Sequence, residues 1–408
     1  MANLFTNVRT YQMSGLALLQ NLYGIIANLN SKFKDFQNKT ANLGDTVTFD
    51  LPPKFSQINS LDVIGGGGFL PAQQRVATLT VNQQIAVPYA VSAQELIFNA
   101  EGYLKMFGRS AIAQIGARIE AQVAQSIISS TYRFYGTPST PVASYGDVAA
   151  ALAQFRTYGS AAVDVKCCLQ DLAVPNIVNT GLQQFVLKRN EEDAVQWMIG
   201  DYDNCRFFRS NLLPTHISGN VGNNNTTLTV VSINGTFDQI TFSGAAISDA
   251  NAIKQYDKLY FLPASGINFV TFIGQEPSAA PVQVIATANA ASNGAGNVVV
   301  SIYPALNPTV GDANQSVTTA VVAGMTVKAL PNFRAGVIWC SEAWYLGMPR
   351  LPDTTPFPSS SEIDPETGLS IRNYYGMNPF ANQYGYVHDA IWGNTLVPEY
   401  AMAVIFPY

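Results

Sequence analysis

Histidine and cysteine are the side chains best suited to act as bases, nucleophiles or metal ligands, and this sequence has few of them. There are two histidines, His216 and His388. The four cysteines are Cys167, Cys168, Cys205 and Cys340. Their spacing matches no zinc-binding pattern, and no Ser-His-Asp or paired-carboxylate layout is recognisable. We therefore predict no catalytic residue, no metal site and no cofactor.

The cysteines are better explained as packing residues than as reactive thiols. Cys167 lies inside the apolar run 163–169, which favours a buried strand position over a nucleophile. Adjacent residues such as Cys167 and Cys168 cannot easily form a relaxed disulfide with each other. We expect all four to be buried thiols in a reducing cytoplasm, and we expect structural or surface roles for His216 and His388.

Two acidic clusters could be mistaken for cation sites. Residues 191–193 (EED) fit the first turn of a helix, where carboxylates offset the helix dipole. Residues 362–366 (EIDPE) lie in a proline-rich stretch and lack the calcium-loop pattern. We interpret the second cluster as a solvated loop, with a salt bridge between subunits as the alternative.

The composition is typical of a subunit that contacts copies of itself. Of 408 residues, 48% are apolar and only 12% are charged, about half the usual charged share. A lone soluble protein uses surface charge to stay apart from its neighbours, so a shortage of charge favours an assembled state. The net charge of −5 argues against a strongly basic surface that wraps nucleic acid. The length favours two domains.

No segment has the pattern of a membrane or export signal. The N-terminal sequence MANLFTNVRTYQMSG lacks a basic region followed by an apolar one. No apolar run reaches the roughly 18 residues of a membrane helix. We expect a chain that is not exported and has no membrane partner.

Residues 46–91 have the alternating pattern of a long β-hairpin, following a polar, Asn-rich arm over 1–45. The alternating apolar residues are Val47, Phe49 and Leu51 on the outgoing strand, and Leu79, Val81, Ile85 and Val87 on the return strand. Between them, the run Gly65 to Gly68 leaves the backbone nearly unrestricted and predicts a hinge or mobile tip.

A helical period begins at Ser92, where SAQE has the form of a capping box. The pattern predicts a short helix to about Asn99 and a longer one from about Tyr103 to Tyr132. The apolar stripe of the longer helix is Ile112, Ile115, Ile119, Val123 and Ile127. Such a helix would be a rod of about 45 Å.

The rest of the chain divides by composition into three parts. Residues 141–215 alternate helix and strand signals, with helices at 147–158, 176–187 and 191–199 and strands at 161–169 and 206–213. Residues 216–330 are short β runs between Gly, Asn, Ser and Pro, which predicts a small antiparallel barrel or sandwich of six or seven strands. Residues 331–408 open with a strand, continue through a proline-rich loop and end in two strands with a turn at Pro398.

This order of parts resembles the Hong Kong ninety-seven capsid fold of tailed phages, and most closely the coat proteins of short-tailed podoviruses that carry an insertion domain. The segments that carry the resemblance are 92–136, KRNEEDAVQWMIGDYDNCRFFRSNLLPTHISG, 256–264, RAGVIWCSEAWYLGMPRLP and WGNTLVPEYAMAVIF. Together they span most of the chain. Each is weak alone, and their order is the stronger signal.

The resemblance implies an α+β fold with an inserted all-β, barrel-like domain. The implied parts are an N-terminal arm (1–45), an extended hairpin loop (46–91), a peripheral domain with a spine helix (92–140), the first part of an axial domain (141–215), the inserted β domain (216–330), and the second part of the axial domain with the C-terminal strands (331–408). The hairpin residues implied at the subunit interface are Lys54, Gly65, Gly66, Gly67, Gly68, Phe69 and Arg75.

The resemblance also implies a function and partners. The chain would be a major capsid protein that forms pentamers and hexamers in an icosahedral shell, enclosing double-stranded DNA without reading its sequence. A scaffolding protein, a portal protein and a decoration protein are the implied partners, and assembly would occur in the bacterial cytoplasm. The covalent cross-link of some members is not carried over, although Lys54 is the hairpin's one lysine. Because the sequence begins at Met1, we expect no removal of an N-terminal segment.

The alternative is a β-rich decoration or fibre protein that binds a surface ligand such as a carbohydrate. Its support is the β-rich region and the aromatic residues of the C-terminal part. These are Tyr374, Tyr375, Phe380, Tyr384, Tyr386 and Trp392. The alternative leaves the long helix and the mixed α/β segments on both sides of the β region unexplained.

Overall fold

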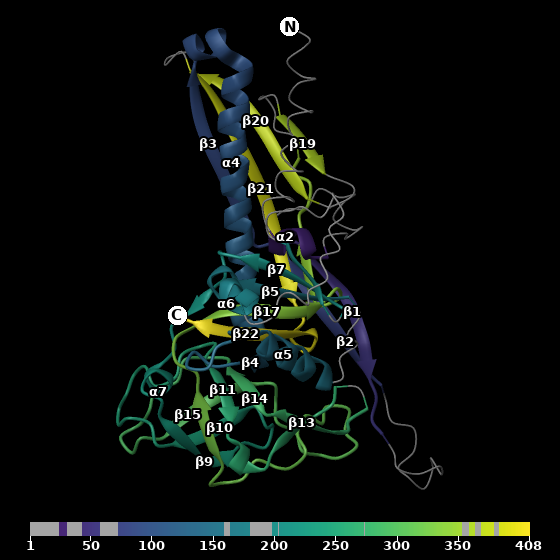
Figure 1. Ribbon diagram of the computed structural model, residues 1–408, viewed down its shortest axis with the longest axis vertical. Helices are drawn as coiled ribbons and strands as arrows, with labels where there is room; N and C mark the ends of the chain where they lie inside the picture. The colour runs from purple at the N-terminus through teal and green to yellow at the C-terminus, as the bar shows by residue number, and fades with distance from the viewer. Residues whose placement is uncertain are drawn as a thin grey trace.

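The computed structural model describes residues 24–30, 43–57, 72–158, 164–179, 198–202, 204–272, 274–352, 359–363, 369–378 and 383–408. Figure 1 shows an elongated molecule with a long helix and sheet at one end, a mixed sheet in the middle and a barrel at the other end. A two-stranded ribbon runs along one side of the middle and lower parts.

The helix and sheet at the upper end combine segments from both ends of the chain. Helix α4 (Ala93–Ser130) lies along a sheet with the strand order β18-β21-β20-β19, in which β3 also pairs with β21. These strands are β3 (Gln83–Ser92), β18 (Trp344–Gly347), β19 (Ser359–Ile363), β20 (Ser370–Asn378) and β21 (Gln383–Leu396). Strands β19 and β20 lie in the part that the sequence analysis assigns to a proline-rich loop.

Helix α4 is one continuous helix of 38 residues, about 57 Å long at 1.5 Å per residue. The sequence analysis predicts a break near residues 100–102, and this prediction is wrong. A glycine inside a helix costs only about 1 kcal/mol, which is too little to interrupt a helix that continues directly from β3. The five residues of the predicted stripe, Ile112, Ile115, Ile119, Val123 and Ile127, are all buried in the main core.

The middle layer is a mixed sheet with the strand order β4-β22-β17-β5-β7-β6, to which β8 adds by pairing with β17. Its strands are β4 (Phe134–Tyr135), β5 (Val165–Gln170), β6 (Met198–Tyr202), β7 (Cys205–Ser210), β8 (Thr215–His216), β17 (Phe333–Cys340) and β22 (Ala401–Pro407). Its helical segments are α5 (Tyr145–Thr157), η1 (Asp171–Ala173) and α6 (Val174–Asn179). The side chains of α5 form one core with this sheet, while those of α4 and of the short α2 (Gly24–Asn28) form another.

The predicted helix over 191–199 is wrong at its end, because residues 198–202 form β6, which pairs with β7. Residues 191–197 lie outside the described ranges. The two C-terminal strands are present with a turn at Pro398, as predicted, and they enter different sheets. Strand β21 pairs with β18, β20 and β3, whereas β22 pairs with β17 and β4. Pro398 begins the 3-10 turn η5 (Pro398–Tyr400), which carries the chain from one sheet to the other.

The inserted region forms a closed six-stranded barrel, as the sequence analysis predicts, in the order β10-β15-β14-β11-β16-β9. The strands are β9 (Thr227–Ile233), β10 (Gln239–Ser243), β11 (Lys258–Phe261), β14 (Gln283–Ala286), β15 (Val298–Tyr303) and β16 (Thr326–Ala329). The pair β12 (Asn268–Val270) and β13 (Pro277–Pro281), the helix α7 (Asn220–Asn223) and the turn η4 (Pro263–Ser265) lie in its connections. Alternate strand residues point inward and make a separate apolar core.

The ribbon consists of β1 (Thr46–Lys54) and β2 (Gln73–Thr80), paired antiparallel from Thr46 opposite Thr80 to Lys54 opposite Gln73. The return strand is shorter than predicted, because Ile85 and Val87 lie in β3 and pair with β21. The two strands separate after Thr80, where β2 packs against β21. Gly393 allows this contact, since a Cβ there would lie 2.0 Å from the carbonyl oxygen of Thr80.

Candidate functional site

The loop end of the ribbon, where Lys54 pairs with Gln73, meets the barrel at one aromatic ring. The Lys54 ammonium lies 4.4 Å from the centroid of the Phe272 ring, and the Arg75 guanidinium carbon lies 4.9 Å from the same centroid. Phe272 follows β12 in the barrel region. It therefore contacts two residues that lie more than 190 positions before it in the sequence. A cation held against an aromatic ring contributes about 0.5–1 kcal/mol when exposed and about 2 or more when desolvated.

A carboxylate from the C-terminal segment completes this contact. Arg75 Nη2 lies 2.8 Å from Glu399 Oε1, and both side chains are less than one-fifth exposed. The phenol of Tyr303 donates to the same carboxylate oxygen at 3.2 Å. Arg133 Nη2 donates to the backbone oxygens of Glu399 at 2.9 Å and Ala401 at 3.2 Å. We call Lys54, Arg75, Phe272, Tyr303 and Glu399 the ribbon latch.

The ribbon latch carries more positive than negative charge. Burial lowers the pKa of Lys54, Glu399 opposes that shift, and the neighbouring Arg75 adds to it. Burial, with the neighbouring Glu399 carboxylate, raises the pKa of Tyr303, so its phenol stays protonated and remains a donor. Arg75 Nη1 is buried and has no hydrogen-bond partner in the described part of the chain. These charges and hydrogen bonds are suited to holding and orienting the ribbon. The latch residues do not pair a nucleophile with a base.

The chain beyond β1 is fixed to the barrel through hydrogen bonds. Gln57 donates from its backbone to Gly311 O at 3.0 Å and from its side chain to Gly274 O at 2.9 Å. The backbone of Ala313 donates to Ser56 Oγ at 3.2 Å. The outward face keeps large apolar side chains in solvent, with Phe55 63% and Val76 58% exposed. The ribbon therefore has an anchored face and a face open to a partner.

No family model matches the sequence. No curated protein is significantly similar to it. Solved structures of phage proteins match most of the chain, although their sequences differ from it almost completely.

The capsid of Ralstonia phage GP4 is 8% identical, covers 91% of this chain and 85% of its own, and has a TM-score of 0.44. A structure from Mycobacterium phage Che8 is 9% identical, with coverage of 93% and 89% and a TM-score of 0.44. The capsid structure of the cyanophage P-SCSP1u is 11% identical, with coverage of 92% and 88% and a TM-score of 0.38.

Of the predicted interface residues, the structure brings Lys54 and Arg75 together in the ribbon latch. Residues Gly65 to Gly68 and Phe69 lie outside the described ranges. The helix stripe lies in the core of the subunit and not in the latch. Sequence reasoning missed Phe272, Tyr303 and Glu399. For Glu399, a signal was present, since it is the one charged residue in the segment 392–406.

Both histidines have buried structural positions. His216 Nε2 lies 2.7 Å from Asp257 Oδ1, and that fully buried carboxylate also accepts from the backbone of Gly219 at 3.0 Å and of Lys254 at 2.9 Å. The network therefore ties β8 of the middle sheet to the barrel. Burial lowers the pKa of His388 to about 4, so it is neutral near pH 7.

Other chemistry has no assembled site in the part of the chain that the structure describes. Within those residues, no three His, Cys, Asp or Glu side chains are grouped to hold a metal ion. The four cysteines are buried and unpaired with one another. No described helix is both long and apolar enough to span a bilayer.

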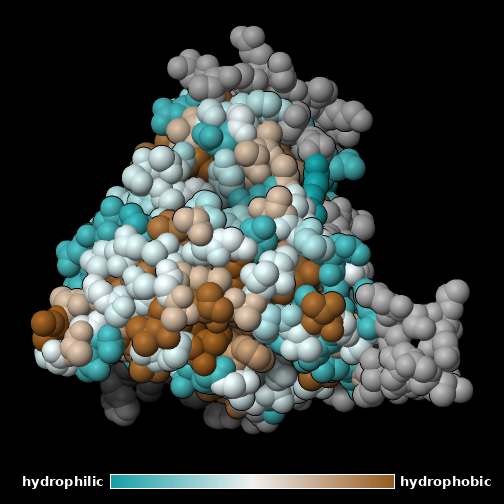
Figure 2. All heavy atoms as spheres, turned by 90° about the horizontal axis from the view of Figure 1, so that it is seen from below, coloured by the Kyte–Doolittle hydropathy of each residue, from teal (hydrophilic) through white to brown (hydrophobic). Residues whose placement is uncertain are grey.

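The barrel exposes apolar side chains on its outside. Val231 on β9 and Val299 on β15 are exposed, as are Ile247 and Val322 in nearby loops. Figure 2, which views the molecule from below, shows apolar side chains gathered on this lower face. Exposed apolar patches often mark surfaces that contact other proteins.

Proposed function

We propose that this chain is the major capsid protein of a tailed phage, which assembles through quasi-equivalent contacts into an icosahedral shell around double-stranded DNA. The observation that carries the proposal is the ribbon. Strands β1 and β2 pair only with each other in the described part of the chain, and a two-stranded ribbon alone is marginally stable in water. A surface of a neighbouring subunit would cover its open face.

The arrangement of the other parts supports the same function. An arm segment, a ribbon, a long helix on a sheet, a mixed sheet and an inserted barrel follow one another along the chain. This is the order of the Hong Kong ninety-seven architecture. In that assignment α4 is the spine helix, the middle sheet belongs to the axial domain, and the barrel is the insertion domain on the outer surface.

The proposed shell implies several partners for this chain. Pentamers and hexamers would form by heterologous contacts, with a scaffolding protein guiding closure and a portal protein at one vertex. A decoration protein is a further candidate, for which the exposed apolar face of the barrel is a suitable surface. With a net charge of −5, the shell would enclose DNA through sparse phosphate contacts and without sequence readout. The subunits would assemble in the host cytoplasm and reside in the virion.

A decoration or fibre protein remains the second candidate, favoured by the barrel. Three of the aromatic residues that could form a carbohydrate platform are packed inside the subunit. Tyr386 stacks between Tyr375 and Tyr89, at centroid distances of 5.8 and 5.5 Å, and Trp392 is fully buried. This packing gives the aromatic residues a structural use and favours the capsid proposal.

The test is negative-stain electron microscopy of the chain, expressed alone and then with the scaffolding candidate from its own phage. We expect closed shells, aberrant shells, tubes or rings of pentamers and hexamers. A strictly monomeric or trimeric species under both conditions would contradict the proposal and would favour the decoration or fibre protein.

A further inference from the structure

Asparagine side chains can react with the protein's own backbone when glycine follows, because glycine has no Cβ to obstruct the approach. The backbone nitrogen of the glycine attacks the side-chain amide carbon, ammonia leaves, and water opens the resulting succinimide. The product is aspartate or isoaspartate. The pair Asn-Gly occurs twice in the sequence, at Asn234-Gly235 and at Asn293-Gly294. Both pairs lie in the barrel region, and their surroundings differ.

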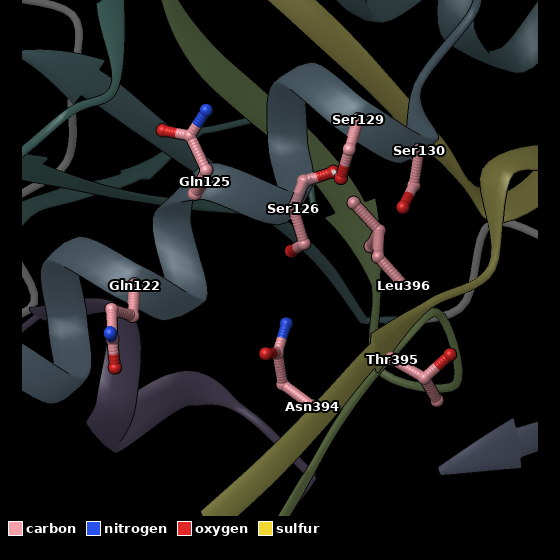
Figure 3. A pocket seen from close by; sticks show the side chains of 8 residues that line it. All are labelled: Gln122, Gln125, Ser126, Ser129, Ser130, Asn394, Thr395 and Leu396. Carbon is pink, nitrogen blue, oxygen red and sulfur yellow. Dashed lines mark hydrogen bonds between the residues drawn. The ribbon is translucent and has the colours of Figure 1, made fainter. Parts of the chain in front are cut away.

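A free amide group alone does not make such a site. Asn394 lines a polar pocket of about 240 Å³ between α4 and β21 (Figure 3), and its Nδ2 has no hydrogen-bond partner among the described residues. That nitrogen is shielded from solvent, and the next residue in β21 is Thr395. Water therefore does not reach the amide, and a β-branched side chain crowds the backbone nitrogen that would attack it.

The two Asn-Gly pairs occupy the same place in two similar turns. Phe237 N donates to Asn234 O at 3.2 Å. In the second turn, Gly296 N donates to Asn293 O at 3.0 Å. Each asparagine is therefore the first residue of a β-turn, and its glycine is the second. Neither glycine N–H donates a hydrogen bond within the described ranges, and nothing lies within 4 Å of a Cβ placed on either glycine.

Backbone N–H groups hold both side-chain carbonyls in the same way. Asn234 Oδ1 accepts two N–H groups at 3.1 Å each. Asn293 Oδ1 accepts two at 2.9 Å each, from Ala295 and Asn297. Such donors stabilise the negative charge that develops on the oxygen when the amide carbon is attacked. The two sites are therefore matched in the groups that assist the attack.

The sites differ at the nitrogen that must leave. Asn234 Nδ2 donates to Thr236 Oγ1 at 2.7 Å and to Asp238 Oδ1 at 2.6 Å. Asn293 is exposed, and its Nδ2 makes no hydrogen bond to the part of the chain that the structure describes. A hydrogen bond to a charged acceptor slows a reaction that must break it by about tenfold or more. The structure therefore protects the first pair and leaves the second one free to react.

We propose that Asn293 is a modification site, at which the folded chain deamidates spontaneously. The Gly294 nitrogen loses its proton to water or hydroxide and bonds to the Asn293 amide carbon. The bond from that carbon to Nδ2 breaks, and this nitrogen takes up a proton from solvent and leaves as ammonia. Water then opens the succinimide. Attack at the side-chain carbonyl gives aspartate, and attack at the main-chain carbonyl gives isoaspartate.

The modification changes the barrel surface beside an exposed apolar side chain. Ser248 N donates to Asn293 O at 3.0 Å, and Asp249 N donates to Ser292 Oγ at 2.8 Å. The turn therefore holds the loop that carries Ile247, which is 70% exposed. Aspartate keeps these bonds and adds a negative charge to this face. Isoaspartate lengthens the main chain by one carbon, so hydrogen exchange of the Ser248 amide should accelerate in that product.

The first experiment compares the two sites in one sample. The purified subunit is incubated at mildly alkaline pH in water enriched in heavy oxygen and is then digested in ordinary water. Mass spectrometry should find the label at residue 293 about tenfold or more faster than at residue 234. In the chain unfolded by denaturant the two rates should be similar, because the hydrogen bonds of both turns are lost. Similar rates in the folded subunit, faster labelling of Asn234, or no label at residue 293 would overturn the inference.

The second experiment tests the cause of the difference. Asp238→Ala removes an acceptor of the Asn234 amide, so residue 234 should gain label about tenfold faster while residue 293 is unchanged. Gly294→Ala fits the fold, since nothing lies within 4 Å of a Cβ there. Its methyl group crowds the attacking nitrogen, so residue 293 should lose most of its label. Unchanged labelling of residue 293 in Gly294→Ala would overturn the inference. Both experiments use the free subunit, so their outcome is independent of the proposed shell.

Discussion

A single buried lysine connects the barrel to the end of helix α4. Lys258 on β11 is fully buried, and its ammonium donates to the backbone oxygen of Thr131 and, at 2.9 Å, to Thr131 Oγ1. Thr131 immediately follows the end of α4, where the helix dipole favours a cation. Burial nevertheless lowers the pKa of Lys258 to about 7. The charged lysine therefore orients the barrel relative to α4, and its burial lowers the free energy of unfolding of the subunit.

Lys258→Met should stabilise the subunit at pH 7, by about 1–4 kcal/mol. The folded pKa of about 7 lies below the ordinary 10.5, so the folded state binds fewer protons between these values. The free-energy cost of burying the charged ammonium is therefore full below pH 7, and it disappears as pH rises towards 10.5. Melting curves of parent and variant should therefore converge over this range. A difference in melting temperature that does not change with pH would contradict the assignment.

Gly393→Ala should destabilise the subunit by about 1–3 kcal/mol, the usual cost of forcing extra volume into a packed site. The new Cβ would lie 2.0 Å from Thr80 O and 2.6 Å from Thr80 C, so β2 and β21 would have to separate. Gly294→Ala is the matched control, because nothing lies within 4 Å of a Cβ there. Equal denaturation midpoints for the two variants would show that the strands adjust without cost.

Among the elements, the short helix α2 is held to the rest of the subunit through polar contacts. The backbone of Ile25 donates to Glu120 Oε2 at 3.3 Å, and Ser210 Oγ donates to Glu120 Oε1 at 2.6 Å. Lys166 Nζ donates to the backbone oxygen of Asn28 at 2.8 Å. Burial raises the pKa of Glu120 to about 7, although these hydrogen bonds oppose the shift. The docking of α2 should therefore depend on pH.

We predict that α2 detaches more readily as pH rises from 4.5 to about 7. Below pH 4.5 Glu120 is neutral in both states, and above 7 its buried charge costs about 3 kcal/mol. Hydrogen exchange of the Ile25 and Ile26 amides, corrected for intrinsic rates, should accelerate between pH 4.5 and about 7 and level off above pH 7. Glu120→Gln should abolish this dependence, and Glu276→Gln, at an exposed position on the barrel, should retain it. An identical response in both variants would contradict the prediction.

At the scale of the whole molecule, the ribbon is held at both ends and open along its outer face. Its Thr80 end packs against β21, and the ribbon latch with the contacts of Ser56 and Gln57 fixes its loop end to the barrel. Folding of the subunit therefore does not require the tip, whereas closure of a shell would require the reach of the whole hairpin.

Deletion of residues 65–71, from Gly65 to Pro71, should leave a folded subunit that no longer forms closed shells. Circular dichroism and the melting temperature should stay close to those of the parent, while electron microscopy should show open sheets or free subunits. Replacement of the same residues by a glycine-serine segment of equal length is the control for hairpin length. Normal closed particles from the deletion variant would contradict the role of the hairpin in lapping a neighbour.

Local periodicity in the sequence determined which segments become helix or strand. The stripe from Ile112 to Ile127 recurs every three or four residues, and burial of one helix face follows from that spacing. The short alternating runs between 216 and 330 likewise determine strands with one inward face, and six of these strands close into a barrel. Composition also indicated that the cysteines are packing residues, and all four are buried.

Tertiary structure alone decided which elements become neighbours. An alternating pattern states that a strand has one buried face, but it does not state which strand lies beside it. For this reason β3 pairs with β21, nearly 300 residues away, and β21 and β22 enter different sheets although a single turn joins them. The ribbon latch has the same origin, because Arg75, Phe272 and Glu399 share no sequence pattern and meet only when three separate parts of the chain fold against one another.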